Sequence, residues 1–92
     1  MGKQIKGPDV IEKQTLVRKQ IVEQYIEQRK NRQLTQTELA SVMGVTRPNI
    51  SRFETGEYNP SLDLLVKMAE CMDLEIEIKL TDKRSGKNGG KE

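Results

Sequence analysis

The sequence lacks histidine and tryptophan, and among its 92 residues it has one Cys, two Tyr and one Phe. One cysteine cannot build a disulfide framework, and a chain without histidine offers no soft-ligand metal site of the kind that holds zinc. General acid–base or nucleophilic chemistry would have to depend on carboxylates, lysine or serine alone. We therefore expect no metal, no cofactor and no enzymatic activity.

Long apolar runs are missing as well. No stretch approaches the ~18 apolar residues of a membrane span, and no signal-peptide core follows the start of the chain. A length of 92 residues, 34% of them hydrophobic, suits one small domain with a single core. We therefore expect a cytoplasmic protein that contacts no membrane.

The charges nearly cancel over the whole chain, with 16 basic and 14 acidic residues, but they are unevenly distributed. Residues 29–52 include five basic residues and one acid, whereas residues 53–77 include seven acids and one lysine. Such a chain can present its basic part to a polyanion and turn its acidic part away. The alternative is a chance distribution over solvated faces, and it stays open unless the basic part also carries a docking element.

The most informative stretch is a pair of short helices with a tight link. Thr35 and Glu38 form a capping box that opens a helix ending at Met43. Gly44 can take the left-handed conformation that stops this helix, and Thr46 already caps the next one, which runs to about residue 55. Two helices joined so closely must cross steeply. An apolar set is expected to hold the pair on the domain, and it comprises Leu39, Met43, Val45, Ile50 and Phe53.

Two more helices are expected around this pair, one over residues 15–31 and one from a cap at Ser61 to about residue 72. This predicts an N-terminal arm (1–14), a domain (15–73) and a flexible, Gly/Lys-rich tail (82–92). Residues 74–81 lie between the domain and the tail, and residues 74–80 (LEIEIKL) alternate apolar and polar side chains, which is typical of a half-buried strand.

The helix over residues 46–55 is expected to have one buried and one polar face. Ile50 and Phe53 are three residues apart and share the buried face. The opposite face and its flank are polar and basic, and they carry Arg47, Pro48, Asn49, Ser51 and Arg52. This face suits the ~12 Å major groove of DNA, where Arg can bond guanine bidentately and Asn can bond adenine.

The string LTQTELASVMGVTRPNISRFETGEYNPSLDLLVKMAECMDL (residues 34–74) resembles the lambda-repressor-like (Xre-type) class of helix-turn-helix regulators. The resemblance covers roughly residues 22–74, and spacing, residue sizes and caps agree along it. It implies a mainly α domain of four to five helices. It also implies a regulator of transcription, most often a repressor, that binds double-stranded DNA.

Carried over by position, the resemblance implies roles for individual residues. Bases would be read by Arg47, Pro48, Asn49, Ser51 and Arg52. Because Pro48 can offer only an apolar contact, readout would rest mainly on Arg47 and Arg52. Phosphates would be contacted by Gln36, Thr46 and Asn59, partly because helix N-termini attract anions. Arg29 and Glu54 match a structural ion pair of the family.

The strand predicted over residues 74–80 needs a partner, because a single strand is not stable. Antiparallel pairing with a second copy, centred on Glu77, would place Glu75 opposite Lys79 and Ile76 opposite Ile78. Such a homodimer would set two recognition helices about 34 Å apart. Pairing with the N-terminal arm (residues 3–11) is the alternative. The expected dimer contacts are Leu64, Met68, Leu74, Ile76, Ile78 and Leu80.

A repressor-like domain followed by LEIEIKL is also similar to antitoxins of bacterial toxin–antitoxin pairs. In those pairs the DNA-binding chain represses its own operon and also binds a toxin protein. This resemblance implies an alternative function, in which the acidic surface binds a protein partner and DNA binding is secondary. The role of residues 1–20 stays open between a partner-binding arm, a dimer element and an extended first helix.

Overall fold

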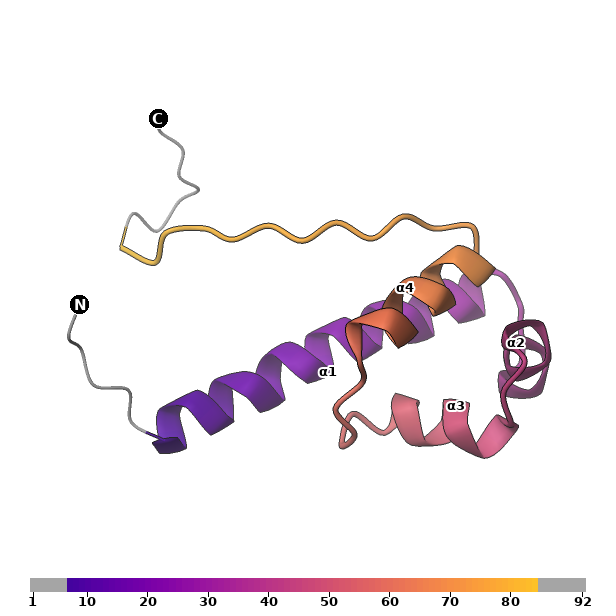
Figure 1. Cartoon of the computed structure of the whole chain (residues 1–92), viewed down its shortest axis with the longest axis horizontal. Coiled ribbons are helices and arrows are strands. Elements are labelled where there is room, and N and C mark those ends of the chain that lie inside the picture. Colours follow the sequence, from indigo (N-terminus) through magenta and orange to yellow (C-terminus); the bar gives the residue numbers. More distant parts are fainter. Residues whose placement is uncertain (1–6, 85–92) are drawn as a thin grey trace.

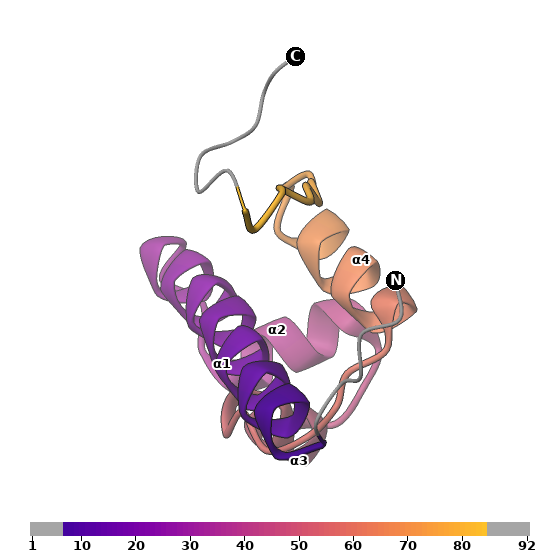
Figure 2. The same ribbon diagram turned by 90° about the vertical axis from the view of Figure 1, so that its left-hand side faces the viewer.

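The structure is a computed structural model, and it describes residues 7–84. Four helices form within this range: α1 (Gly7–Asn31), α2 (Gln36–Met43), α3 (Arg47–Glu54) and α4 (Leu62–Cys71). α1 runs along most of the molecule, and α2, α3 and α4 gather around its C-terminal half (Figure 1). Viewed toward the N-terminal end of α1, α3 lies below this long helix and α4 lies on the opposite side of the domain from α3 (Figure 2). The predicted mainly α fold is confirmed.

α1 begins at Gly7, about eight residues before the predicted start near residue 15. Pro8 falls in its first turn, where the missing N–H costs no hydrogen bond, and Asp9 carries a negative charge near the positive end of the helix. The added turns contain mostly exposed polar side chains, so apolar spacing did not reveal them. Residues 7–11 are helical and therefore cannot pair as a strand with residues 74–80. The rest of the predicted arm, residues 1–6, lies outside the described range, as do residues 85–92 of the predicted tail.

The core lies between the C-terminal half of α1 and the other three helices. Within it the rings of Tyr25 and Phe53 pack edge to face, with 5.6 Å between their centroids. The Tyr25 hydroxyl donates a hydrogen bond of 2.9 Å to the backbone oxygen of Leu65, and burial raises the pKa of Tyr25 above its ordinary value. The buried apolar residues are Val22, Tyr25, Leu39, Ala40, Met43, Ile50, Phe53, Met68, Ala69 and Met72. Four of the five residues predicted to hold the helix pair are among them, and the fifth, Val45, is partly buried.

The caps that were predicted from the sequence define the starts of α2 and α4. The Thr35 hydroxyl accepts a hydrogen bond from the N–H of Glu38, and the Glu38 carboxylate accepts one from the N–H of Thr35. Gly44 stops α2 in the left-handed conformation, with φ of 74°. The Ser61 hydroxyl accepts a hydrogen bond from the N–H of Leu64. These local hydrogen bonds, together with the turn at Gly44, fix the limits of the helices around the tight link.

Residues 74–80 run without regular secondary structure back toward the N-terminal end of α1 (Figure 1). Within residues 7–84 no strand forms, so this part of the chain supplies no partner for the segment. Leu74 and Ile76 are half-buried, whereas Ile78 and Leu80 are exposed. Pairing across a dimer therefore stays a prediction. Separately, none of the helices described here is long and apolar enough to cross a membrane.

Candidate nucleic-acid interface

α3 presents a polar face to solvent and an apolar face to the core. Ile50 and Phe53 are each only 1% exposed, and they fix which side of α3 points inward. Of the five predicted base-reading residues, Ser51 is half-buried and the other four are exposed: Arg47, Pro48, Asn49 and Arg52. The structure thus brings a basic and amide-bearing surface together on one short helix.

Two of these side chains are coupled one helical turn apart. Arg52 donates a hydrogen bond of 3.3 Å from Nη1 to the amide oxygen of Asn49. The bond occupies the amide oxygen and leaves the Asn49 NH2 group able to donate. The two side chains can then act as one unit with several donors, which suits the acceptor-rich edges of purines.

The start of α3 is only partly capped. Thr46 has the extended backbone of a cap residue, but its hydroxyl makes no capping hydrogen bond. In α2 the equivalent hydroxyl, that of Thr35, is engaged with Glu38. The Thr46 side chain is exposed and can therefore serve a ligand at the positive end of α3.

A single carboxylate joins three helices behind this surface. Glu54, the last residue of α3, accepts hydrogen bonds from Arg29 Nε at 2.7 Å and from Arg29 Nη2 at 3.0 Å. The same Glu54 accepts one from Gln36 Nε2, at the start of α2, at 2.8 Å. Arg29 also donates from Nη1 to the backbone oxygen of Leu34 at 2.7 Å. The structure therefore places Arg29 and Glu54 in an ion pair, as the resemblance implied.

The three predicted phosphate contacts come from three separate elements. Gln36 lies at the start of α2, Thr46 caps α3, and Asn59 lies exposed in the α3–α4 turn. The Gln36 NH2 group uses one N–H on Glu54 and keeps the second. The hydrogen bond to Glu54 thus fixes the orientation of the Gln36 side chain, and the second N–H remains free to bind an anion.

Arg32 has a structural role that the sequence did not reveal. Its Nε donates to the backbone oxygen of Met72 at 2.8 Å, and its Nη1 donates to Gln28 Oε1 at 2.6 Å. Arg32 thereby ties the end of α1 to the end of α4. With Arg29 buried in its ion pair, two of the five basic residues in the basic stretch serve the fold. Arg47, Arg52 and Lys30 are the other three, and all are exposed.

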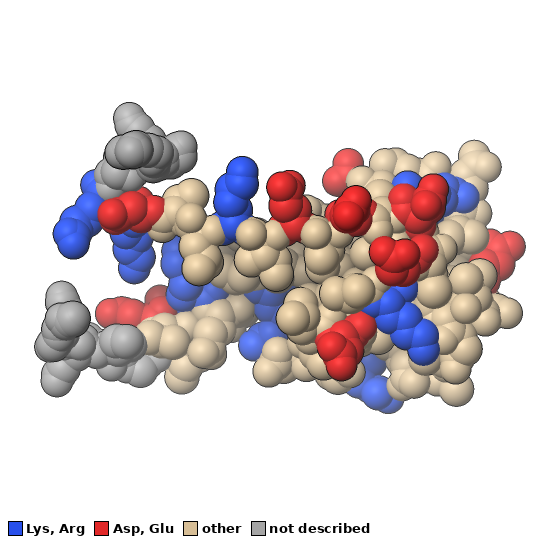
Figure 3. Space-filling model, turned by 45° about the horizontal axis from the view of Figure 1, so that its top comes forward, with Lys and Arg blue, Asp and Glu red and all other residues tan. Residues whose placement is uncertain are grey.

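The residues expected at a dimer contact are divided between core and surface. Met68 is 1% exposed and belongs to the core of the single chain, so its expected place on the dimer surface is wrong. Leu64, Leu74 and Ile76 are half-buried, and Ile78 and Leu80 are exposed. Exposed acids lie at the end of α4 and along residues 73–77. They include Glu70, Asp73, Glu75 and Glu77. Figure 3 shows acidic side chains gathered on the face of the molecule that it presents.

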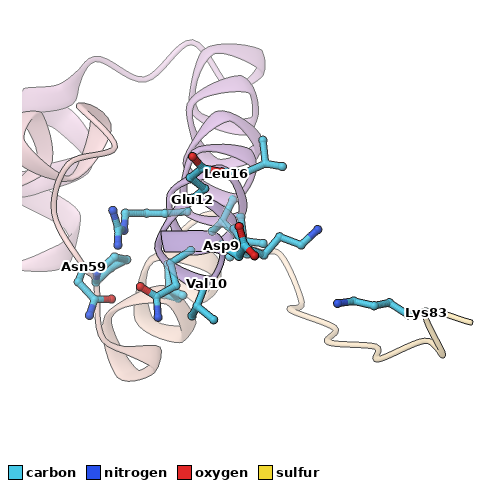
Figure 4. A pocket seen from close by; sticks show the side chains of 13 residues that line it. Asp9, Val10, Glu12, Leu16, Asn59 and Lys83 are labelled. Atoms are coloured by element: carbon cyan, nitrogen blue, oxygen red, sulfur yellow. The ribbon is translucent and has the colours of Figure 1, made fainter. Parts of the chain in front are cut away.

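A groove of about 1070 Å³ runs beside the N-terminal half of α1, and sequence reasoning did not anticipate it. Asn59 of the α3–α4 turn and Lys83 lie on opposite sides of α1 there (Figure 4). Its lining combines apolar side chains such as Val17 and Leu65 with charged ones such as Arg18. Among the described residues, no group of three or more His, Cys, Asp or Glu is placed to hold a metal ion.

Comparison with known proteins identifies the family. A helix-turn-helix family model matches residues 26–79. The chain is 34% identical over 65 residues to the ImmF control region 10 kDa protein of Bacillus phage phi105, a match that covers 70% of this chain and 72% of the phage protein. It is 46% identical over 44 residues to an uncharacterized HTH-type transcriptional regulator of Methanocaldococcus jannaschii, a match that covers 48% of this chain and 67% of the archaeal protein.

The chain is also 36% identical over 62 residues to antitoxin HigA1 of Mycobacterium tuberculosis, covering 67% of this chain and 42% of the antitoxin. No solved structure matches significantly. The family model spans more than half of the chain and includes α2, α3 and α4. From this match and the four-helix fold, the chain belongs to the lambda-repressor-like helix-turn-helix family.

Proposed function

We propose that this protein is a dimeric regulator of transcription that reads a specific sequence in double-stranded DNA and represses the genes beside it. α3 enters the major groove, with Arg47 and Arg52 as the main base-reading residues. The observation that carries this proposal is the exposed face of α3, because it collects polar and basic side chains on a helix whose other face is fully buried.

The interior of the domain supports this use of α3. The Glu54 carboxylate holds α1, α2 and α3 together through Arg29 and Gln36. A recognition helix that is held in this way keeps its angle to the start of α2, where Gln36 would contact a phosphate. Contacts to phosphates set the register of a protein on the duplex, and contacts to bases then give sequence preference.

Dimer formation is proposed to use residues 74–80. Antiparallel pairing centred on Glu77 brings the exposed Ile78 opposite the half-buried Ile76 of the second copy. Each copy would then cover apolar surface that it leaves open by itself. The two-fold axis of such a dimer also suits an operator with two similar half-sites.

The proposal of repression rests on the resemblance of the domain to lambda-repressor-like proteins. The relatives named above include a transcriptional regulator and a phage control-region protein. We place the protein in the cytoplasm, where its DNA would be, and propose that it works without a cofactor or catalytic activity.

The test is selection from a pool of random duplexes with the purified protein at physiological salt, followed by sequencing of the retained DNA. Enrichment of a pseudo-palindrome with half-sites about one helical turn apart is the expected result. Weak binding that vanishes as salt rises, with no enriched sequence, would contradict the proposal, because only the nonspecific electrostatic contribution would remain.

A second candidate function is binding of a protein partner, such as a toxin, through the acidic face near residues 70–77. The exposed acids Glu70, Asp73, Glu75 and Glu77 favour it, together with the similarity to antitoxin HigA1. One comparison of variants distinguishes the two functions. Arg47→Ala should lower affinity for the selected duplex by about 1–3 kcal/mol, relax one base position and leave a basic partner bound. Glu70→Lys combined with Asp73→Lys should instead release the partner and preserve DNA reading.

A further inference from the structure

The α3–α4 turn lies beside the proposed DNA-binding helix and carries no positive charge. Its residues 55–61 read TGEYNPS, in which Glu57 is the single charged residue. Asn59 is the predicted phosphate contact there, and it is neutral. In the proposed complex, a duplex that holds α3 in its major groove runs one backbone strand past this turn, because the turn directly follows α3. Glu57 alone would repel that strand.

α1 places two cations against this turn. The side chain of Lys19 packs on Gly56, since its Cγ lies 3.4 Å from the position that a Cβ on Gly56 would take. Gly56 itself has φ of 79°, which bends the chain at the end of α3. The neighbouring Arg18 is half-buried and lines the groove together with Pro60 and Asn59, which is labelled in Figure 4.

The charged groups of Arg18 and Lys19 have no partner among the described residues. Within residues 7–84 the one ion pair is that of Arg29 with Glu54, and no hydrogen bond of the Arg18 or Lys19 side chain is formed. Arg29 and Arg32, by contrast, are bound to Glu54 and to the Met72 backbone. A lysine whose stem packs on the protein surface keeps its ammonium group in water, where it can meet an anion.

We propose that Arg18 and Lys19 form an outer phosphate-binding site, which holds the sugar–phosphate backbone of the duplex as it passes the α3–α4 turn. The inference rests on the proposed DNA-binding function. The ligand is the phosphodiester and not the base, so the site adds affinity without sequence preference. In this way α1 supplies the positive charge that the turn lacks.

The experiment compares the double variant Arg18→Gln/Lys19→Gln with Lys67→Gln, which removes one exposed positive charge from α4. Figure 2 shows that α4 lies on the far side of the domain from α3. Affinity is measured by fluorescence anisotropy over a salt series, on the duplex enriched by selection and on a scrambled duplex. The double variant should bind both duplexes more weakly by a similar factor. The slope of log K against log salt should fall by about 0.9 for each phosphate that is no longer neutralised, hence by about 1.8.

Lys67→Gln should leave the slope unchanged. The charge-keeping variant Arg18→Lys/Lys19→Arg should restore both slope and affinity, and circular dichroism confirms that each variant is folded. An unchanged slope in the folded double variant overturns the outer site. If Arg47→Ala still weakens binding to the selected duplex and relaxes one base position in that case, DNA reading stands and only the outer site fails. A wild-type chain that binds no duplex overturns both.

Discussion

Arg29 and Glu54 lie 25 residues apart in the sequence and form a two-pronged ion pair, with nitrogen–oxygen distances of 2.7 and 3.0 Å. Their side chains are only 10% and 9% exposed. Because Gln36 binds the same carboxylate, Glu54 joins α1, α2 and α3 in addition to their shared apolar core. A substitution that breaks this ion pair should therefore affect both the stability of the helix pair and the proposed binding to DNA.

Glu54→Ala should lower the free energy of unfolding by about 3 kcal/mol, because it leaves the Arg29 guanidinium buried without a counter-charge. Glu57→Ala, three residues later on the exposed turn, should change it by less than about 0.5 kcal/mol. Urea unfolding followed by circular dichroism gives both values. Equal decreases in the two variants would mean that the ion pair contributes nothing.

Thr35 and Thr46 occupy the same cap position on successive helices and should respond differently to substitution. Thr35→Ala removes the capping hydrogen bond to Glu38 and should cost about 1 kcal/mol of stability. Thr46→Ala removes a hydroxyl that makes no such bond, so it should have little effect on thermal unfolding. It should instead weaken DNA binding on all sequences alike. Equal thermal shifts would argue against the proposed division of roles.

Arg47→Ala and Arg52→Ala should each lower affinity for the selected operator by about 1–3 kcal/mol and relax one base position. Asn49→Ala should mimic part of the Arg52 effect, because it frees the guanidinium from its neighbour. Repeating the selection with each variant shows which base preference has disappeared. Lys30→Ala, an exposed basic residue in the last turn of α1, serves as the control and should retain the whole motif.

Ile78→Asp should convert the proposed dimer to a monomer, because it places a charge on the apolar side of the pairing segment. Ile78 is 69% exposed, so the fold of the single chain should survive. Val42→Asp is the matched control, since Val42 is an apolar residue of similar exposure on α2. Light scattering after gel filtration gives the masses.

The same segment offers a charge-swap test. Glu75→Lys or Lys79→Glu alone should weaken association, and the two together should restore it, because in the proposed dimer each residue faces the other type on the second copy. If wild type and Ile78→Asp have the same mass, the segment does not mediate dimer formation.

Tyr25 should make stability depend on pH in the alkaline range. Burial raises its pKa in the folded chain above the ordinary value of 10.0, so the folded state keeps this proton longer than the unfolded state. The stabilisation is therefore present below pH 10 and is lost as the pH rises further. Tyr25→Phe should cost about 1 kcal/mol at neutral pH because it removes the bond to Leu65, and this difference should narrow above pH 10. A difference that is constant from about pH 7 to about pH 11 would contradict this.

The helix pair could be predicted from the sequence almost to the residue because its signals are local. Thr35, Gly44 and Ser61 each satisfy or redirect the backbone within a few residues, so their meaning does not depend on distant partners. The start of α1 lacked such a signal in the pattern of apolar residues. The first turns of α1 make few contacts with the core. A helical segment that buries no face shows no apolar periodicity in its sequence.

Other features depend on contacts that only the folded chain defines. α4 has apolar residues on more than one side, and the sequence could not tell that Met68 would face the core while Leu62 stays 56% exposed. Likewise, nothing near Arg32 indicates that it reaches the Met72 backbone 40 residues away. The predicted pairing of residues 74–80 would involve a second molecule, and the contacts within one chain do not contain it.

The length of α1 gives the protein a gradient of local stability. Its 25 residues span about 37 Å, yet its buried residues, Val22, Tyr25 and Arg29, all lie in its C-terminal half. From residue 9 to residue 20 none is buried, so those turns are held mainly by their own backbone hydrogen bonds. Isolated helical segments of this length are marginal in water. The N-terminal turns of α1 should therefore unfold locally far more often than the whole domain unfolds. A duplex or a second copy that binds these turns must hold them helical, and this lowers the net free energy of its binding.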